Sequence, residues 1–199
     1  MKDLSLHLLD IIENSAKAGA TCVTVCFNRS THTLTLTISD NGPGMPQIFR
    51  RNPGDPYQTT RITRKVGLGL SLLKEAAEQT GGTMIVAHPQ EGGVRIEAIF
   101  DMSHVDAKPL GDLAEAFSTA IAAWPNLDLI VRLPPSQDDV FNTKTIKAEL
   151  QDVPLTYPSI RQFIAECLIE ALTPLHAWAA DIAFQTMRQG DHTERRKSD

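Results

Sequence analysis

The feature that most constrains how this chain can fold is a strand that ends in an acidic, glycine-rich turn. Residues 33–38 read TLTLTI, and this alternation is typical of a half-buried β-strand. The strand continues directly into SDNGPGMP, residues 39–46, although an ordinary hairpin needs only one Asn-Gly or Asp-Gly pair. A carboxylate and two glycines at this position indicate that a ligand or another backbone segment comes close to the end of the strand.

The segments around this turn predict an α+β fold. Apolar periodicity and the positions of Gly and Pro divide the first hundred residues into alternating helical and strand segments. Their order favours a sandwich with helices on one face of a mainly antiparallel sheet. The expected elements are a helix over 3–18, strands over 21–27 and 33–39, a helix over 70–80, and strands over 83–88 and 94–100.

After residue 100 the sequence changes character and predicts a small second α/β unit. We expect a first domain over 1–104, a docking or dimerisation unit over 105–187 and a disordered tail over 188–199. The second unit carries no chemical motif, and its apolar helices need a partner face, which the first domain could also supply. Its expected elements are a helix over 112–124, strands over 127–133 and 140–143, and helices over 144–151 and 159–172, with a break or kink at Pro174.

The composition excludes several classes of protein. The 199 residues carry a formal net charge of −5, which gives no reason to expect nucleic acid or an anionic membrane as the main partner. The chain has no run of about 18 apolar residues that would predict a transmembrane helix. Its N-terminal segment MKDLSLHLLDIIEN lacks the features of a signal peptide. We therefore expect a cytoplasmic protein.

One polar stripe runs along the first expected helix. Asp3, His7, Asp10, Asn14 and Lys17 recur at spacings of three and four, which places them on one face of an otherwise mostly apolar helix. The stripe is either the solvated edge of a core helix or a surface that faces a polar ligand. On the second interpretation, its carboxylate, carboxamide and ammonium groups could serve a water molecule, Mg²⁺ and a phosphate.

The turn after the second strand supplies another candidate. Asp40 lies at the end of a buried strand, where an unpaired carboxylate is unfavourable, so it needs a hydrogen-bond donor. The amino group of a purine would suit it, and Gly42 and Gly44 would let such a ligand approach closely. The alternative is a glycine-rich turn in which Asp40 acts only as a cap.

The third candidate is KVGLGL, residues 65–70, at the start of the second helix. Glycines before a helix expose free backbone N–H groups that suit a phosphate. The segment over 46–66 carries five cationic side chains and one carboxylate, so it is either a lid over an anion or a solvated loop. Neither GxxxxGKS/T nor a GxGxxG motif that opens a βαβ unit is present, so a nucleotide site depends on the three candidates together.

Taken in order, these segments resemble the motifs of the GHKL, or Bergerat-fold, ATPases, which include DNA gyrase, histidine kinases and MutL. ENSAKAGA, residues 13–20, is similar to their N box, DNGPGM, residues 40–45, to the first glycine box, and VGLGL, residues 66–70, to the second. DPYQTTR, residues 55–61, is similar to the lid of many histidine kinases. The resemblance covers residues 1–104 and is closest to small stand-alone ATP-binding proteins that are often encoded beside iron-only hydrogenases.

The resemblance implies ATP and Mg²⁺ as cofactors and a role for individual residues. Asp40 would accept a hydrogen bond from the adenine amino group, and Gly42 and Gly44 would make room for the purine. Asn14 would hold Mg²⁺, and Asp10 takes the place of the glutamate found in hydrolysing members. The remaining nucleotide contacts would come from Lys17, Thr60, Arg61, Lys65, Gly67, Leu68, Gly69 and Leu70.

Three functions remain open at this point. The chain could be an ATPase or a kinase that acts on a separate protein, a nucleotide-dependent switch with little turnover, or a scaffold that no longer binds nucleotide. Asp40, Asn14 and the GLGL segment argue against a scaffold. Asp10 divides the other two, because its side chain is one methylene shorter than the family's glutamate. The phosphoacceptor and dimerisation helices of sensor kinases are expected to be missing, and we expect a protein partner of unknown identity or a homodimer.

Overall fold

The computed structural model describes residues 2–44, 68–135, 138–151 and 153–195. Apart from the last helix, every expected boundary lies within two residues of the observed one, and the expected α+β class is confirmed. The helices are α1 (Leu4–Lys17), α3 (Leu68–Gln79), α4 (Leu113–Ala123), α5 (Thr143–Leu150) and α6 (Pro158–Arg195). The strands are β1 (Cys22–Arg29), β2 (Thr33–Asp40), β3 (Thr83–Ala87), β4 (Arg95–Asp101), β5 (Asp128–Arg132) and β6 (Asp139–Asn142).

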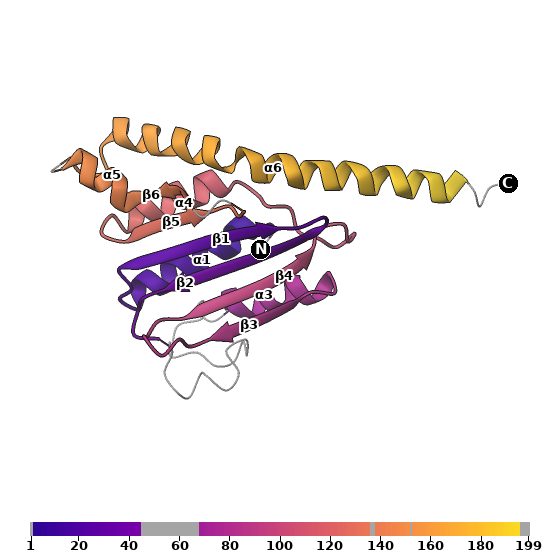
Figure 1. The fold of residues 1–199 in the computed structure, drawn as a ribbon, viewed down its shortest axis with the longest axis horizontal. Helices are drawn as coiled ribbons and strands as arrows, with labels where there is room; N and C mark the ends of the chain where they lie inside the picture. The colour runs from indigo at the N-terminus through magenta and orange to yellow at the C-terminus, as the bar shows by residue number, and fades with distance from the viewer. Residues whose placement is uncertain (1, 45–67, 136–137, 152, 196–199) are drawn as a thin grey trace.

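Within the described residues, six strands form one sheet in the order β3-β4-β2-β1-β5-β6 (Figure 1). Neighbouring strands are antiparallel except β1 and β5, which run parallel. This parallel pair joins the two halves of the chain, with Cys22 opposite Asp128 and Cys26 opposite Arg132. The expected second unit therefore extends the sheet of the first domain and does not form a layer of its own.

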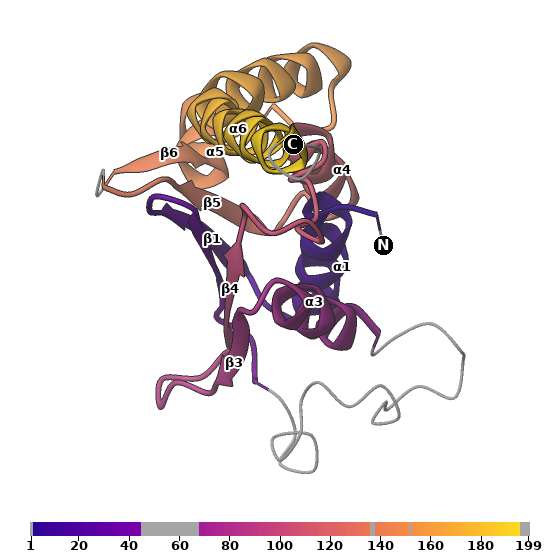
Figure 2. The same cartoon turned by 90° about the vertical axis from the view of Figure 1, so that its right-hand side faces the viewer.

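The core lies between the sheet and the helices α1, α3 and α4, which Figure 2 shows on one side of the sheet. In β1 and β2 the alternation decides which face of the sheet the helices cover, because every second residue, such as Val25 in β1 and Leu36 in β2, is buried. Phe27 meets Phe117 of α4 edge to face, with ring centroids 6.4 Å apart. One continuous apolar core reaches α6, so the first domain supplies a partner face for the apolar helices of the second unit.

The structure corrects the expected end of the last helix. α6 is a single helix of 38 residues that passes through Pro174, where a break or kink was expected. A proline inside a helix removes one N–H group and usually weakens the helix. Here the β1–β2 turn supports it, because Arg29 donates to the Pro174 carbonyl and Trp178 Nε1 donates to the Ser30 carbonyl at 3.1 Å.

The expectation of a disordered tail is also wrong for residues 188–195, because α6 continues to Arg195. Extending an existing helix adds one hydrogen bond per residue without a new nucleation step, so polar residues can join it. Residues 196–199 lie outside the described ranges. Despite its length, α6 is not apolar enough to cross a membrane, and the same holds for every other described helix.

Candidate functional site

A pocket of about 220 Å³ lies between α1, the turn after β2, the start of α3 and β4. It brings together four residues that the sequence analysis selected: Asn14, Asp40, Gly44 and Leu70. The three candidate segments therefore meet at one cavity. The other lining residues are mostly small or apolar: Ile11, Ser15, Ala18, Pro43, Val94 and Ile96.

Three donors hold the carboxylate of Asp40 at the wall of this pocket. Ser15 Oγ donates to Oδ2 at 2.9 Å. The backbone N–H groups of Gly42 and Val94 donate to Oδ1 at 2.9 Å and 3.3 Å. The bond from Gly42 is a local cap, as the alternative interpretation expected. A carboxylate offers about four acceptor positions, however, so Asp40 keeps capacity for a further donor from the pocket.

Two glycines beside the pocket adopt backbone conformations that favour glycine. Gly93 adopts a φ of +80°, and a Cβ atom there would lie 1.9 Å from the Asp40 carbonyl oxygen. Gly44 adopts a φ of +77° where it lines the pocket. Sequence reasoning missed both Gly93 and Ser15. The doubled glycine at residues 92–93 was a usable signal for the first, but nothing in the sequence indicates that Ser15 contacts a residue 25 positions later.

Asp10 and Asn14 form a hydrogen-bonded pair beside the first turn of α3. Asn14 Nδ2 donates to Asp10 Oδ2 at 2.9 Å. The turn comes so close that a Cβ atom on Gly69 would lie 1.9 Å from the same oxygen, so a side chain there would displace the carboxylate. Burial raises the pKa of Asp10 above its usual 3.8, and the hydrogen bond from Asn14 only partly offsets that effect.

His7 shows that the polar stripe of α1 is not a solvated edge along its whole length. Its side chain is fully buried, and among the described residues neither ring nitrogen has a hydrogen bond of ordinary geometry. The ring nevertheless lies near the backbone of Gly69. Burial, together with the positive charge of Lys108, lowers the pKa of His7 to about 4, so the imidazole is neutral at pH 7.

The structure does not bring every selected residue to the pocket. Lys17 is exposed, and its Nζ contacts Glu13 Oε2 at 2.6 Å instead of lining the cavity. Leu68 and Gly69 belong to the first turn of α3, as expected for residues that offer backbone N–H groups. The expected lid over 46–66 lies outside the described residues, and so do Thr60, Arg61, Lys65 and Gly67.

Comparison with known proteins covers the half of the chain that builds this pocket. Residues 2–104 match the family of histidine kinase-, DNA gyrase B- and HSP90-like ATPases. The match is longer than half of the chain and includes α1, the turn after β2 and the start of α3. The chain belongs to this ATPase family. Residues 2–104 therefore form an ATP-binding domain of the histidine kinase type, and the resemblance seen in the N box and the two glycine boxes is confirmed.

Two curated relatives are similar to part of this chain. The signal transduction histidine-protein kinase AfsQ2 of Streptomyces coelicolor is 32% identical over 94 residues, which are 45% of this chain and 18% of AfsQ2. The nitrogen regulation protein NtrY of Azorhizobium caulinodans is 34% identical over 98 residues, which are 45% of this chain and 13% of NtrY. The chain thus spans less than a fifth of the length of these relatives.

Solved structures that are similar to part of this chain include two mycobacterial proteins. A solved chain of the mycobacterial sensor histidine kinase MprB is 26% identical, with a TM-score of 0.38, and the match covers 47% of this chain and 66% of that chain. The ATP-binding domain of PrrB from Mycobacterium tuberculosis is 26% identical, with a TM-score of 0.36. The match covers 49% of this chain and 66% of that chain. Both similarities are confined to about half of the present chain.

Proposed function

We propose that this chain binds Mg-ATP in the pocket between α1, β2 and α3 and transfers the γ-phosphoryl group slowly, to water or to a separate protein. The observation that carries the proposal is the Asp40 carboxylate, which three donors hold at the wall of a largely apolar pocket. Beside it, the Asp10–Asn14 pair lies against the first turn of α3. An apolar pocket with one oriented carboxylate, next to the N-terminus of a helix, suits an adenine nucleotide.

In this proposal Asp40 accepts a hydrogen bond from the adenine amino group. Ser15 acts as a positioning residue, because its hydroxyl orients Asp40 Oδ2. Apolar side chains such as Ile11 and Ile96 contact the faces of the purine. A pocket of about 220 Å³ is smaller than typical sites for whole ligands, which occupy about 300–1,000 Å³. It therefore suits the base, while the phosphates extend past Asn14 toward α3.

The residues around α3 also fit Mg²⁺ bound together with phosphate. Asn14 donates through Nδ2 to Asp10, which leaves its amide oxygen as a ligand of the kind that Mg²⁺ prefers. Among the described residues, no cluster of three His, Cys, Asp or Glu side chains could hold a metal without other ligands. Mg²⁺ commonly binds through one or two protein groups and substrate phosphates. A bound Mg²⁺ would neutralise phosphate charge.

Asp10 is the proposed catalytic residue. Its carboxylate lies one helical turn from Asn14 on the same face of α1, where it can accept a hydrogen bond from an attacking water or a partner hydroxyl. The side chain is shorter than the family's glutamate by one methylene, roughly 1.5 Å, and a misplacement of about 1 Å can cost about 100-fold in rate. We therefore expect turnover below the enzyme median of about 10 s⁻¹.

A non-hydrolysing switch is the second candidate function. The short Asp10 side chain favours it, because Asn14 and the first turn of α3 already restrain the carboxylate in its present position. In that case ATP binding would act through a partner that recognises the nucleotide-bound conformation. The link to proteins encoded beside iron-only hydrogenases stays a prediction and names no partner.

The proposed function can be tested with γ-labelled ATP. The purified chain is incubated with the label, alone and with cell extract, and both free phosphate and labelled protein are followed. Phosphate release by the chain alone supports hydrolysis, and a labelled protein that requires the chain supports a kinase. ATP binding without either product would favour the switch. Failure to bind ATP, measured by calorimetry on the same folded sample, would contradict the proposal in all its forms.

A further inference from the structure

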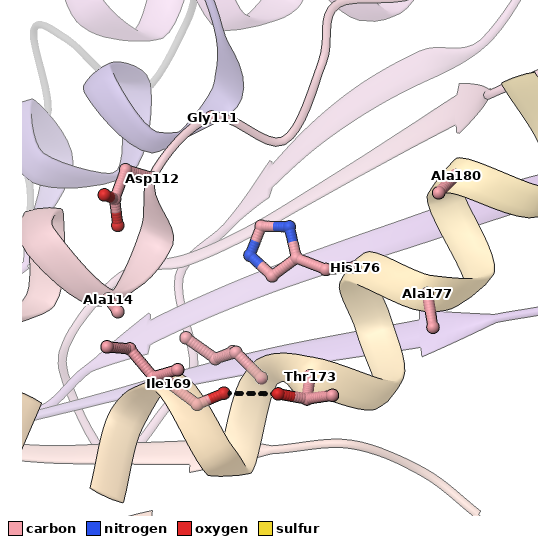
Figure 3. A pocket seen from close by; sticks show the side chains of 9 residues that line it. Gly111, Asp112, Ala114, Ile169, Thr173, His176, Ala177 and Ala180 are labelled. Atoms are coloured by element: carbon pink, nitrogen blue, oxygen red, sulfur yellow. Dashed lines mark hydrogen bonds between the residues drawn. The ribbon is translucent and has the colours of Figure 1, made fainter. Parts of the chain in front are cut away.

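A groove of about 720 Å³ runs between the start of α4 and the middle of α6. Figure 3 shows the His176 ring pointing from α6 toward Asp112 and Ala114 on the α4 side. Of the described residues, none lines both this groove and the Asp40 pocket. The α6 wall consists of apolar or small side chains and one histidine: Ile169, Leu172, Thr173, His176, Ala177 and Ala180.

The α6 wall continues beyond the groove as an exposed, mainly apolar face. Three of its side chains are large and well exposed: Ile169 at 59%, Phe184 at 60% and Met187 at 74%. Residues spaced by three or four lie on one face of a helix. The face defined in this way is called the α6 stripe, and its residues are Ile169, Thr173, His176, Ala180, Phe184 and Met187.

No segment within the described ranges covers the α6 stripe. Another face of α6, which carries Ile164, Leu168 and Leu175, is buried in the core. A flank of the helix contacts the β1–β2 turn through Pro174 and Trp178. The C-terminal part of α6, yellow in Figure 1, projects beyond the sheet. Large apolar side chains on a projecting helix indicate an interface with another molecule.

We propose that the α6 stripe binds a second copy of this chain, with the two α6 helices antiparallel about a two-fold axis near residue 178. That position lies midway between Ile169 and Met187, so Met187 of each copy packs against Ile169 of the other. The paired region, from Ile169 to Met187, is about 27 Å long at 1.5 Å per residue. A two-fold interface uses the same surface on both copies, so the stripe must be complementary to itself. The two contacts between Met187 of one copy and Ile169 of the other satisfy this condition.

In the same antiparallel arrangement, the projecting end of α6 of one copy lies at the groove between α4 and α6 of the other. Phe184 of one copy comes opposite Thr173 of the other, where the groove between α4 and α6 is open. Near the axis, the small side chains of Ala177 and Ala180 allow the two helices to approach closely. The projecting end of each α6 thus fills the groove of the other copy, which neither copy can fill alone.

Charges beside the stripe favour a second copy in this orientation. Glu170 and Arg188 lie 18 residues apart, which is five helical turns, so both are on the same flank of α6. About 27 Å separates them within one chain, so they cannot form a pair there. The antiparallel arrangement brings Glu170 of each copy near Arg188 of the other. A parallel two-fold pair would put this flank of the two helices on opposite sides of the interface, with Glu170 and Arg188 at opposite ends, so neither charge pair could form and both grooves would stay empty.

The side chains at the projecting end are already positioned for this contact. The Arg188 guanidinium lies 5.5 Å from the centroid of the Phe184 ring. A cation at this distance is attracted to the face of an aromatic ring. The contact places the charge of Arg188 beside the aromatic side chain that enters the groove. One end of the stripe therefore presents an aromatic ring and a cation together to the groove and Glu170 of the other copy.

The first test measures the oligomeric state of the full chain by sedimentation equilibrium over a range of concentrations. We expect a monomer–dimer equilibrium. Phe184→Glu should raise the dissociation constant about tenfold or more, because it places a charge in the groove of the other copy. The matched control is Ile85→Glu on β3, where Ile85 is also 60% exposed, and it should leave the constant unchanged. Helix content by circular dichroism should be the same in all three proteins.

The second test reverses the charges. Arg188→Glu alone should weaken the dimer about threefold, and Arg188→Glu combined with Glu170→Arg should restore it, because both charge pairs then re-form across the interface. A monomer at every concentration, or a dimer that Phe184→Glu leaves unchanged, would overturn the proposal. A dimer that the double variant fails to restore would overturn the antiparallel arrangement. Because the groove is separate from the Asp40 pocket, ATP affinity reports on the proposed function independently.

Discussion

Asp40 in the N-terminal half and Asp112 in the C-terminal half both accept a hydrogen bond from a backbone N–H group a few residues away. Asp112 accepts from Glu115 at 2.9 Å and caps α4. Asp40 accepts from Gly42 at the same distance, but it also accepts from two other segments of the chain. A carboxylate held by its own segment stabilises a helix end, whereas one held by three segments around a cavity is positioned for a ligand.

The same contrast separates two asparagines. Asn142 lies at the start of α5, where its Oδ1 accepts from the Lys144 N–H at 2.9 Å and serves as a cap. Asn14 lies inside α1, a position that asparagine does not favour, and its amide donates to Asp10. Asn142 thus stands where local structure needs a polar residue. Asn14 stands against local preference, as is common at functional sites.

The largest expected effect is on the pH dependence of stability, and it comes from His7, a buried polar group in the N-terminal half. Its pKa is about 4 in the folded chain and 6.5 in the unfolded chain, so between these values only the unfolded chain binds the proton. Stability should therefore fall as the pH drops from 6.5 toward 4, by about 3 kcal/mol in total for this residue.

Chemical denaturation across this pH range measures the effect. His7→Leu should remove this part of the pH dependence without a large loss of stability at pH 7, because it replaces an unpaired polar group with an apolar one. His32→Leu, at an exposed histidine, serves as the control and should keep the parental slope. An unchanged slope in His7→Leu would show that His7 is not held neutral.

The next prediction compares the two asparagines directly. Asn14→Ala should weaken Mg-dependent ATP binding by about 2 kcal/mol, because it removes the proposed Mg²⁺ ligand and leaves Asp10 without its donor. Asn142→Ala should leave that affinity unchanged. Calorimetry with and without Mg²⁺ measures both variants. Equal losses of ATP affinity in the two variants would contradict the assignment of Asn14 as a ligand-binding residue and Asn142 as a cap.

Asp10→Asn should slow phosphate release, or phosphoryl transfer to the partner, about tenfold or more, which corresponds to about 1.4 kcal/mol in the activation free energy. The affinity for Mg-ATP should not change. The substitution keeps size and polarity and removes the charge. Because burial raises the pKa of Asp10, parental turnover should also decline at a higher pH than for an ordinary aspartate as the carboxylate is protonated. Parental turnover by the variant in a single-turnover assay would rule out Asp10 as the catalytic group.

The smallest expected effect belongs to Asp112 in the C-terminal half. Asp112→Ala should lower the free energy of unfolding by about 1 kcal/mol, the usual cost of losing an N-cap. ATP affinity should stay at the parental value, because Asp112 does not line the Asp40 pocket. Urea denaturation and calorimetry on the same sample give both quantities. A loss of affinity without a loss of stability would contradict the assignment of Asp112 as a cap.

Local patterns predicted most of the elements and part of the candidate site. The alternation in TLTLTI and the doubled glycine after α3 mark boundaries that depend on nearby residues alone. The spacing of Asp10 and Asn14 on one helical face is likewise local, and the structure shows them hydrogen-bonded. Because helix geometry determines which residues share a face, these relations can be read without knowledge of the tertiary structure.

The relations that sequence reasoning missed are long-range. Ser15 contacts Asp40 only because α1 packs across the end of β2, and the parallel pairing of β1 with β5 joins segments about a hundred residues apart. The sequence predicts a break or kink at Pro174, and the contacts of α6 with the β1–β2 turn could not be foreseen because they are tertiary contacts. Tertiary contacts of this kind override local preference, so they appear only in the folded structure.

The most direct test of the account is the ADP affinity of Asp40→Ala, measured by calorimetry. The control is Asp101→Ala, because Asp101 also ends a strand and also accepts from a backbone N–H and a hydroxyl, both of Ser103, at 2.9 Å and 2.6 Å. We expect Asp40→Ala to lose about 1.5–3 kcal/mol of binding free energy, since the adenine amino group loses a charged acceptor. Asp101→Ala should bind like the parent. An affinity of folded Asp40→Ala within about twofold of the parent, a difference of only about 0.4 kcal/mol, would contradict the adenine site.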